Sequence, residues 1–207
     1  MTIDEIMRLA PVIPVLIIDE VEQAAPLGRA LVEGGLPVLE VTLRTPAGLA
    51  CIERMAREVE GAVVGAGTVT TRALRQAVAD AGARFAVSPG LIDGETAEGP
   101  TPLLPGIATA TELMAGIAAG FERFKLFPAN VAGGTEAIKA FRSPFAEARF
   151  CPTGGVNLKN AADYLALPNV LCVGGTWIAP PDLVRAGDWA EITRRAREAA
   201  ALARPTA

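Results

Sequence analysis

Histidine is absent from this sequence of 207 residues. Its absence excludes general acid–base catalysis by imidazole, the Ser-His and Cys-His nucleophile systems, and nearly every catalytic zinc site. Any reaction must therefore use carboxylates, lysine, arginine, hydroxyl groups or backbone amides. Lysine is also scarce, since only Lys125, Lys139 and Lys159 stand among the 19 basic side chains. Each lysine is therefore a candidate for a specific role.

Cysteine, long apolar runs and basic stripes are also missing or rare. The three cysteines are far apart and form no CxxC pair, which favours reduced, buried thiols. Residues 1–5 lack the basic region and apolar run of a signal peptide, so we expect a cytoplasmic protein. No stretch reaches the roughly 18 apolar residues that a membrane helix needs. The net charge of −4, with no basic stripe, predicts no binding to nucleic acid.

The hydrophobic residues, 51% of the chain, recur in a pattern typical of a buried parallel sheet. Strand-like apolar runs occupy residues 12–18, 38–43, 62–65, 85–87, 102–104, 124–127, 149–151 and 170–173. Amphipathic segments of helical length fill most of the gaps, which predicts an α/β fold. Eight units favour a (β/α)8 TIM barrel, preceded by a short helix at residues 2–10. No linker divides the chain, so residues 1–207 are predicted to form a single domain.

Capping residues predict where several helices begin. Thr45 precedes a proline at a first helical position, and Thr109 opens a capping box. Asn157 is expected to cap a helix that runs to about residue 165, and Asp188 to begin a long C-terminal helix. Residues 93–100 have room for only a short turn of helix, so this unit is predicted to be thin.

Lys125 lies inside an apolar strand-like run. Lysine is almost never fully buried without a partner or a function. Apolar surroundings favour the neutral amine, which can attack a carbonyl and form a Schiff base. The alternative is a structural lysine paired with a carboxylate inside the barrel. Lys139 and Lys159 fall on predicted helices and are expected to be solvated.

Other polar residues and glycines gather at the predicted carboxyl ends of strands, which share one rim in a barrel. Glu40 could move protons if it lies beside Lys125, or it could form a static ion pair with it. The Arg44 guanidinium could donate two hydrogen bonds to a carboxylate or phosphate, although Arg44 could also be an ordinary surface arginine. Residues 154–155 and 174–176 are glycine-rich and follow the seventh and eighth strands. Loops at these positions commonly bind phosphate through backbone N–H groups, which predicts a phosphate site.

The motifs at these strand ends resemble those of class I 2-keto-3-deoxy-6-phosphogluconate (KDPG) aldolases, of the KDPG/KHG aldolase family. The resemblance extends from about residue 11 to residue 200. The matching segments are PVIPV (11–15), EVTLRT (40–45), VGAGTV (64–69), SPG (88–90), LPG (104–106), FKLFPA (124–129), RFCPTGG (149–155) and CVGG (172–175). The sequence departs from the family at residues 93–100, where relatives carry a fuller helix.

The resemblance implies a function and a role for each motif. Lys125 would form an imine with the C2 ketone, and Glu40 would take the C4 hydroxyl proton and later protonate the enamine. The products would be pyruvate and glyceraldehyde 3-phosphate. Pyruvate would be held by Arg44, Thr68 and Thr153, the pocket would be shaped by Pro89 and Phe127, and the phosphate would be bound by Gly154, Gly155, Gly174, Gly175 and Thr176. Neither a metal nor another cofactor is implied, and the family pattern implies a homotrimer.

Two alternatives remain open from the sequence. The substrate could be the galactonate epimer, 2-keto-3-deoxy-6-phosphogalactonate, or 4-hydroxy-2-oxoglutarate, although residues 43–45 and 151–155 favour the gluconate compound. The chain could also be a non-catalytic barrel scaffold that serves assembly. The presence of Lys125, Glu40 and Arg44 together argues against a scaffold, which need not keep a buried lysine.

Overall fold

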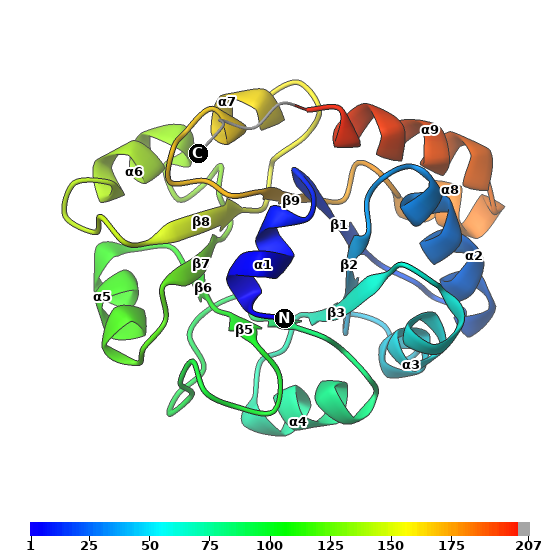
Figure 1. Cartoon of the computed structure of the whole chain (residues 1–207), viewed down its shortest axis with the longest axis horizontal. Coiled ribbons are helices and arrows are strands. Elements are labelled where there is room, and N and C mark those ends of the chain that lie inside the picture. Colours follow the sequence, from blue (N-terminus) through cyan, green and yellow to red (C-terminus); the bar gives the residue numbers. More distant parts are fainter. Residues whose placement is uncertain (203–207) are drawn as a thin grey trace.

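The structure is a computed structural model, and it describes residues 1–202. Its strands are β1 (Val12–Leu16), β2 (Val38–Thr42), β3 (Val63–Gly67), β4 (Ala86–Val87), β5 (Leu103–Leu104), β6 (Gly106–Ile107), β7 (Arg123–Leu126), β8 (Arg149–Pro152) and β9 (Val173–Gly175). Its helices are α1 (Ile3–Arg8), α2 (Val21–Glu33), α3 (Gly48–Glu58), α4 (Arg72–Asp80), α5 (Ala110–Ala118), α6 (Gly134–Phe141), α7 (Ala161–Leu165), α8 (Pro181–Ala186) and α9 (Trp189–Ala200). Figure 1 shows α1 at the centre of the view and the other helices around the outside.

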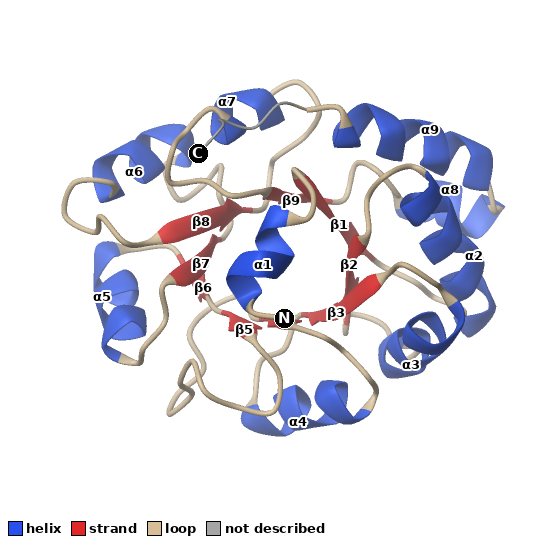
Figure 2. Cartoon of the chain, in the orientation of Figure 1, coloured by secondary structure: helices blue, strands red, loops and turns tan. Residues whose placement is uncertain are grey.

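The strands pair in parallel throughout the described residues. They form a six-stranded sheet in the order β5-β4-β3-β2-β1-β9 and a three-stranded sheet in the order β6-β7-β8. Single bridges join Phe150 to Val170 and Thr153 to Gly174, beside β8 and β9. Figure 2 shows the strands curled around one centre, with helices outside them. The predicted α/β fold with parallel strands is therefore confirmed.

The strand predicted at residues 102–104 corresponds to β5, and a second short strand, β6, follows Pro105. Proline has no N–H to donate to a neighbouring strand, so β5 and β6 are separate. β5 pairs with β4, whereas β6 pairs with β7, where Gly106 stands opposite Lys125. The last strand also differs from the prediction, because β9 includes Gly174 and Gly175, which were expected to follow it.

Buried apolar side chains form two layers. The outer layer fills the space between the strands and the surrounding helices. The inner layer lies within the curled strands and includes Ile13 of β1, Phe85 before β4 and Cys172 before β9. Ile6 and Met7 of α1 belong to this inner layer and are fully buried. The short N-terminal helix therefore closes the inner layer at the amino ends of the strands.

Two of the predicted helix starts are confirmed, and a third is wrong. Thr109 forms a capping box at α5, and the Asp188 side chain accepts a backbone hydrogen bond at the start of α9. The helix expected directly after Thr45 begins only at Gly48. The Thr45 hydroxyl is engaged elsewhere, since it donates to the Ile18 carbonyl at 2.6 Å and joins the loops after β1 and β2.

The helix expected from Asn157 is also shorter than predicted. α7 begins at Ala161, and residues 158–160 form a turn before it. The reason is that the side chains of Asn157 and Asn160 bond to the loop before the turn. Lys159 is exposed in this turn rather than on a helix, whereas Lys139 is exposed on α6 as predicted.

Residues 93–100 contain no helix, in agreement with the thin unit that was predicted. The buried side chain of Arg75, on α4, fixes this segment instead. Its guanidinium is ion-paired with Glu95 and donates to the carbonyls of Thr96, Glu98 and Thr101. One arginine thus donates to carbonyls that in a helix would accept from backbone N–H groups.

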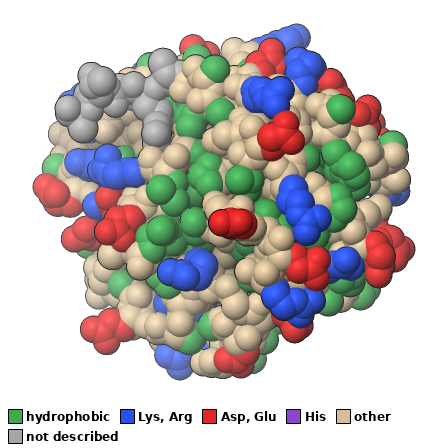
Figure 3. Space-filling model, turned by 45° about the vertical axis from the view of Figure 1, so that its right-hand side comes forward, with side chains coloured by type: hydrophobic (Ala, Val, Ile, Leu, Met, Phe, Trp, Pro, Cys, Tyr) green, Lys and Arg blue, Asp and Glu red, His purple; other side chains and the backbone are tan. Residues whose placement is uncertain are grey.

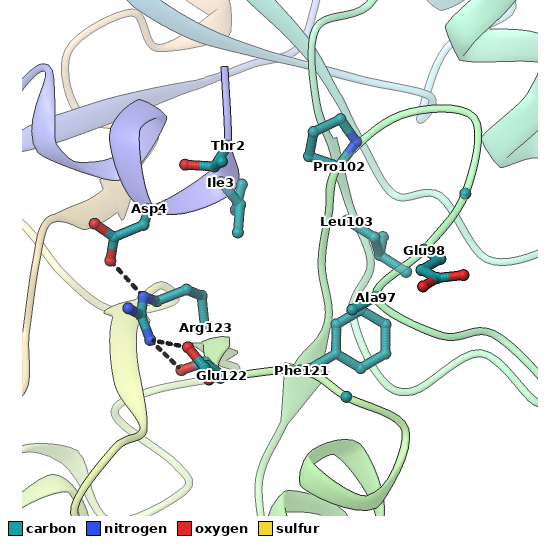
Figure 4. A pocket seen from close by; sticks show the side chains of 12 residues that line it. Thr2, Ile3, Asp4, Ala97, Glu98, Pro102, Leu103, Phe121, Glu122 and Arg123 are labelled. Atoms are coloured by element: carbon teal, nitrogen blue, oxygen red, sulfur yellow. Dashed lines mark hydrogen bonds and ion pairs between the residues drawn. The ribbon is translucent and has the colours of Figure 1, made fainter.

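A cavity of about 620 Å³ lies at the amino ends of the strands, between α1 and residues 97–103. Figure 4 shows the ion-paired side chains of Asp4, Arg123 and Glu122 on one side and the apolar side chains of Leu103 and Phe121 on the other. Parallel α/β enzymes carry their reacting groups at the opposite, carboxyl ends of strands. This cavity is therefore on the wrong side of the sheet for the predicted chemistry.

Charged side chains of both signs are interspersed on the face drawn in Figure 3. Exposed ion pairs among the described residues include Arg197 with Glu33 at 2.7 Å. Each exposed pair contributes at most about 1 kcal/mol to stability. Among the described helices, none has the length and hydropathy that crossing a membrane requires.

Candidate active site

Lys125 and Glu40 meet at the centre of the curled strands. Lys125 is in β7 and Glu40 is in β2, and the Nζ to Oε1 distance is 3.3 Å. Each side chain is only 5% exposed. A buried charge needs a partner, and this contact provides one for both groups. Proton transfer across it would give a neutral amine beside a carboxylic acid, which is the form in which lysine attacks a carbonyl.

Gly67 makes room for the Glu40 carboxylate. A Cβ at this position would lie 2.2 Å from Glu40 Oε1 and 2.8 Å from its Cγ, closer than side-chain carbons come in real structures. Only glycine leaves Glu40 free to turn toward Lys125 in this arrangement. The strand pattern alone gave Gly67 no role, because the contact joins β3 to a side chain of β2.

Thr68 follows β3 in a left-handed backbone conformation, with φ of 64°. Such a φ is a genuine outlier for a β-branched residue and costs free energy. Backbone hydrogen bonds on both sides hold it there, from Leu43 N–H to the Gly67 carbonyl and from Val69 N–H to the Val87 carbonyl. Conformations of this kind gather at functional sites, and the binding role of Thr68 stays a prediction.

Arg44 is exposed in the turn after β2. Within residues 1–202 its guanidinium has neither an ion pair nor a hydrogen-bond partner. The backbone beside it is nevertheless fixed, because Thr42 and Thr45 both donate hydroxyl hydrogen bonds to carbonyls of the neighbouring loop. An anchored arginine with free donors is suited to binding an anion.

Phe127 directly follows β7, and Pro89 lies in the loop after β4. The Lys125 Nζ is 5.0 Å from the centre of the half-buried Phe127 ring, within cation–π range. Pro89 is exposed in the loop after β4. The preceding residue, Ser88, is fully buried and was given no role from the sequence. Its hydroxyl donates to the Gly90 carbonyl at 2.6 Å and accepts weakly from the Gly106 N–H at 3.4 Å, so it ties the Pro89 loop to β6.

Thr153 follows β8 and is buried, with Oγ1 3.9 Å from the Cys151 sulfur. A Cβ on Gly174 would lie 2.3 Å from Thr153 Oγ1. Glycine at position 174 therefore lets β9 approach Thr153, a packing role that the sequence did not predict.

The other predicted phosphate-site residues lie in the two loops beside Thr153. Gly154 and Gly155 both have positive φ, 99° and 75°, which other residues rarely adopt. Gly175 ends β9, and Thr176 is exposed directly after it. The described residues contain no group of three or more His, Cys, Asp or Glu side chains that could hold a metal ion.

Comparisons with known proteins agree on one family. The family model for KDPG and KHG aldolase matches residues 3–195. The 2-dehydro-3-deoxy-phosphogluconate aldolase of Dickeya dadantii is 50% identical over 201 residues, which cover 96% of this chain and 94% of that protein. Two solved structures are similar along nearly their whole length. KDPG aldolase from Legionella pneumophila, with pyruvate captured at low pH as a covalent carbinolamine intermediate, is 43% identical with a TM-score of 0.93, covering 96% of this chain and 98% of that one.

The second structure is the 2-keto-3-deoxy-6-phosphogluconate aldolase of Zymomonas mobilis ZM4 with 3-phosphoglycerate. It is 48% identical with a TM-score of 0.90, covering 97% of this chain and 96% of that one. Agreement in sequence, fold and coverage leads to one conclusion: this chain belongs to the KDPG and KHG aldolase family.

Proposed function

We propose that this chain is a class I aldolase that cleaves 2-keto-3-deoxy-6-phosphogluconate into pyruvate and glyceraldehyde 3-phosphate. The observation that carries the proposal is the contact between Lys125 and Glu40, two buried groups 3.3 Å apart in a member of an aldolase family. A lysine nucleophile beside a carboxylate supplies the two functions that the reaction needs, imine formation and proton transfer.

The reaction would begin at the Lys125 amine. It attacks the C2 carbonyl of the substrate to give a carbinolamine, whose hydroxyl takes the proton of the Glu40 carboxylic acid and leaves as water, which gives an iminium ion and the Glu40 carboxylate. Glu40 takes the proton of the C4 hydroxyl, so the C4 aldehyde forms as the C3–C4 bond breaks. The electron pair of that bond enters the iminium and gives an enamine, and glyceraldehyde 3-phosphate leaves. Glu40 returns its proton to C3, and water then hydrolyses the new iminium to release pyruvate and free Lys125.

The remaining site residues would bind the substrate. The free donors of Arg44 fit the pyruvate carboxylate, with the hydroxyls of Thr68 and Thr153 on nearby oxygens. Phe127 would stabilise the positive iminium as it contacts the Lys125 ammonium group, and Pro89 would form the facing wall. The phosphate would lie on the backbone N–H groups of Gly154, Gly155, Gly174 and Gly175 and the Thr176 hydroxyl.

We also infer that residues 1–207 form one domain whose strands close into a (β/α)8 barrel. Two features support closure: Pro105 alone separates β5 from β6, and the bridge between Thr153 and Gly174 links β8 to β9. A homotrimer in the cytoplasm remains our proposal for the assembly and location, and sedimentation of the purified protein tests the assembly.

The nucleophile is tested by borohydride reduction in the presence of pyruvate, followed by peptide mass spectrometry. We expect a pyruvate-derived adduct on the peptide that contains Lys125 and on neither Lys139 nor Lys159, which serve as internal controls. No adduct on a folded protein would make Lys125 structural and would favour the scaffold interpretation.

The substrate is tested by comparing turnover of the gluconate and galactonate epimers and of 4-hydroxy-2-oxoglutarate. We expect preference for the gluconate compound, which residues 43–45 and 151–155 favour. Equal rates with both epimers would contradict this choice of substrate while leaving the imine chemistry in place.

A further inference from the structure

The carbonyl of Gly155 accepts two side-chain hydrogen bonds. Asn160 Nδ2 donates to it at 3.0 Å and Asn157 Nδ2 at 3.3 Å. Asn157 directly precedes the turn before α7 and Asn160 ends it, whereas Gly155 lies in the loop proposed to bind phosphate. Neither asparagine has a place in the chemistry described so far.

The orientation of both amide groups is determined by further hydrogen bonds. Asn160 Oδ1 accepts from the Asn157 backbone N–H at 2.8 Å, and Asn157 Oδ1 accepts from the Lys159 N–H at 3.0 Å. Because each side-chain oxygen already faces a donor, each NH2 group must face the Gly155 carbonyl. The two side chains therefore form a fixed clamp on one peptide group.

This clamp determines where the next N–H points. In a trans peptide the C=O and the following N–H point in opposite directions, so the Val156 N–H faces away from the two asparagines. The preceding peptide is held in the same manner, because the Gly154 carbonyl accepts from the Asn130 N–H at 3.1 Å. Among the described residues, nothing accepts from the N–H groups of Gly155 and Val156.

We propose that Asn160, assisted by Asn157, is a positioning residue for the substrate phosphate: it holds the Gly155 carbonyl so that the N–H groups of Gly155 and Val156 bind the anion. The inference rests on the phosphate site proposed above and adds Val156 N–H to its donors. Two consecutive glycines with positive φ would otherwise leave this loop several conformations of similar free energy. Fixing them in advance lowers the entropic cost of binding.

The test uses the aldol direction, with pyruvate and either D-glyceraldehyde 3-phosphate or unphosphorylated D-glyceraldehyde. For Asn160→Ala we expect kcat/KM for the phosphorylated aldehyde to fall about tenfold, as the loss of one or two well-placed hydrogen bonds predicts. We expect the value for D-glyceraldehyde and the borohydride adduct with pyruvate to stay unchanged. Asn157→Ala should show a smaller loss of the same kind, because its contact is longer, and it serves as the second variant if Asn160→Ala does not fold.

Asp163→Ala is the control, since this exposed residue of α7 has no described side-chain hydrogen bond to the loop. Equal losses with both aldehydes would show a general structural effect and would overturn the role of Asn160. Unchanged kinetics in both asparagine variants, in an enzyme that prefers the phosphorylated aldehyde, would overturn it as well. If the unmodified protein has no such preference, the phosphate site itself is wrong, and the positioning role falls with it.

Discussion

The substitution Gly67→Ala places a methyl group against the proposed proton carrier. The new Cβ would lie 2.2 Å from Glu40 Oε1, so the carboxylate must move by about 1 Å to reach an ordinary contact distance. It cannot escape by rotating its end alone, because the Cβ would also lie 2.8 Å from Glu40 Cγ. A displacement of about 1 Å in a catalytic group typically lowers the rate about 100-fold. We therefore expect cleavage to slow by this factor while Lys125 is still able to form its imine.

Two measurements on pyruvate alone separate these steps. Deuterium exchange at the pyruvate methyl group, followed by NMR in D2O, reports proton transfer by Glu40, and borohydride trapping reports imine formation. In Gly67→Ala, exchange should be slow and trapping should be close to normal.

Gly65→Ala provides a contrast on the same strand. Its Cβ would lie 2.3 Å from the buried Phe85 ring, so the loss should fall mainly on the free energy of unfolding. If Gly67→Ala exchanges methyl protons at the rate of the unmodified protein, the arrangement of Glu40 described above is incorrect.

Three further changes test the site and the fold. Lys125→Ala should abolish cleavage and borohydride trapping while circular dichroism stays unchanged, and activity near that of the unmodified protein would eliminate the Schiff base. Glu40→Gln should still form the adduct but exchange methyl protons slowly, so normal exchange would remove Glu40 from the proton-transfer role. Arg75→Leu should lower the free energy of unfolding in urea by about 3 kcal/mol, because it leaves Glu95 without its buried partner. A loss below about 0.5 kcal/mol would show that residues 93–100 do not depend on Arg75.

Acid should weaken the ion pair between Glu95 and Arg75 and the ion pairs of Asp4. Burial raises the pKa of Glu95, but the hydrogen bonds and charges of Arg75 and Arg72 outweigh it and leave that pKa below its ordinary value. The pKa of Asp4 is lowered in the same way, against burial, by Arg8 and Arg123. A carboxyl whose pKa is depressed on folding stabilises the protein above its unfolded pKa, and this contribution is lost as pH falls through the folded pKa. Stability measured by urea unfolding should therefore decline below about pH 4, and less so in Glu95→Gln.

The sequence predicted the chemical groups of the site better than the contacts that arrange them. A lysine between apolar residues in a strand and glycines after neighbouring strands are local patterns, and they indicated the proposed nucleophile and the candidate phosphate loops. Gly67, Ser88 and Asn160 could not be found in this manner. Gly67 meets the Glu40 side chain of another strand, and Ser88 meets Gly106 of β6, so no local pattern records these contacts. The bond from Asn160 to Gly155 spans only five residues, but it depends on a loop conformation that the residue pattern does not reveal.

The fold class could also be predicted from local patterns, whereas the limits of several elements could not. Alternating apolar runs and helix-length segments predicted the parallel α/β arrangement, because periodicity is a local property. Element limits were less predictable where tertiary contacts decide them. Thr45 was expected to open a helix and instead bonds to Ile18, and the shortened segment at residues 93–100 is shaped by Arg75 from another helix.

The position of α1 also has a consequence for the order of events during synthesis. Ile6 and Met7 are synthesised before the other residues of the inner layer that buries them, which extends to Cys172. Contacts so distant along the chain cannot form until most of the protein has been made. α1 is therefore made before most of the strands, yet it is among the last elements to reach its final place. Until then the apolar side chains of Ile6 and Met7 stay uncovered in the newly made chain, whereas they are fully buried in the folded protein.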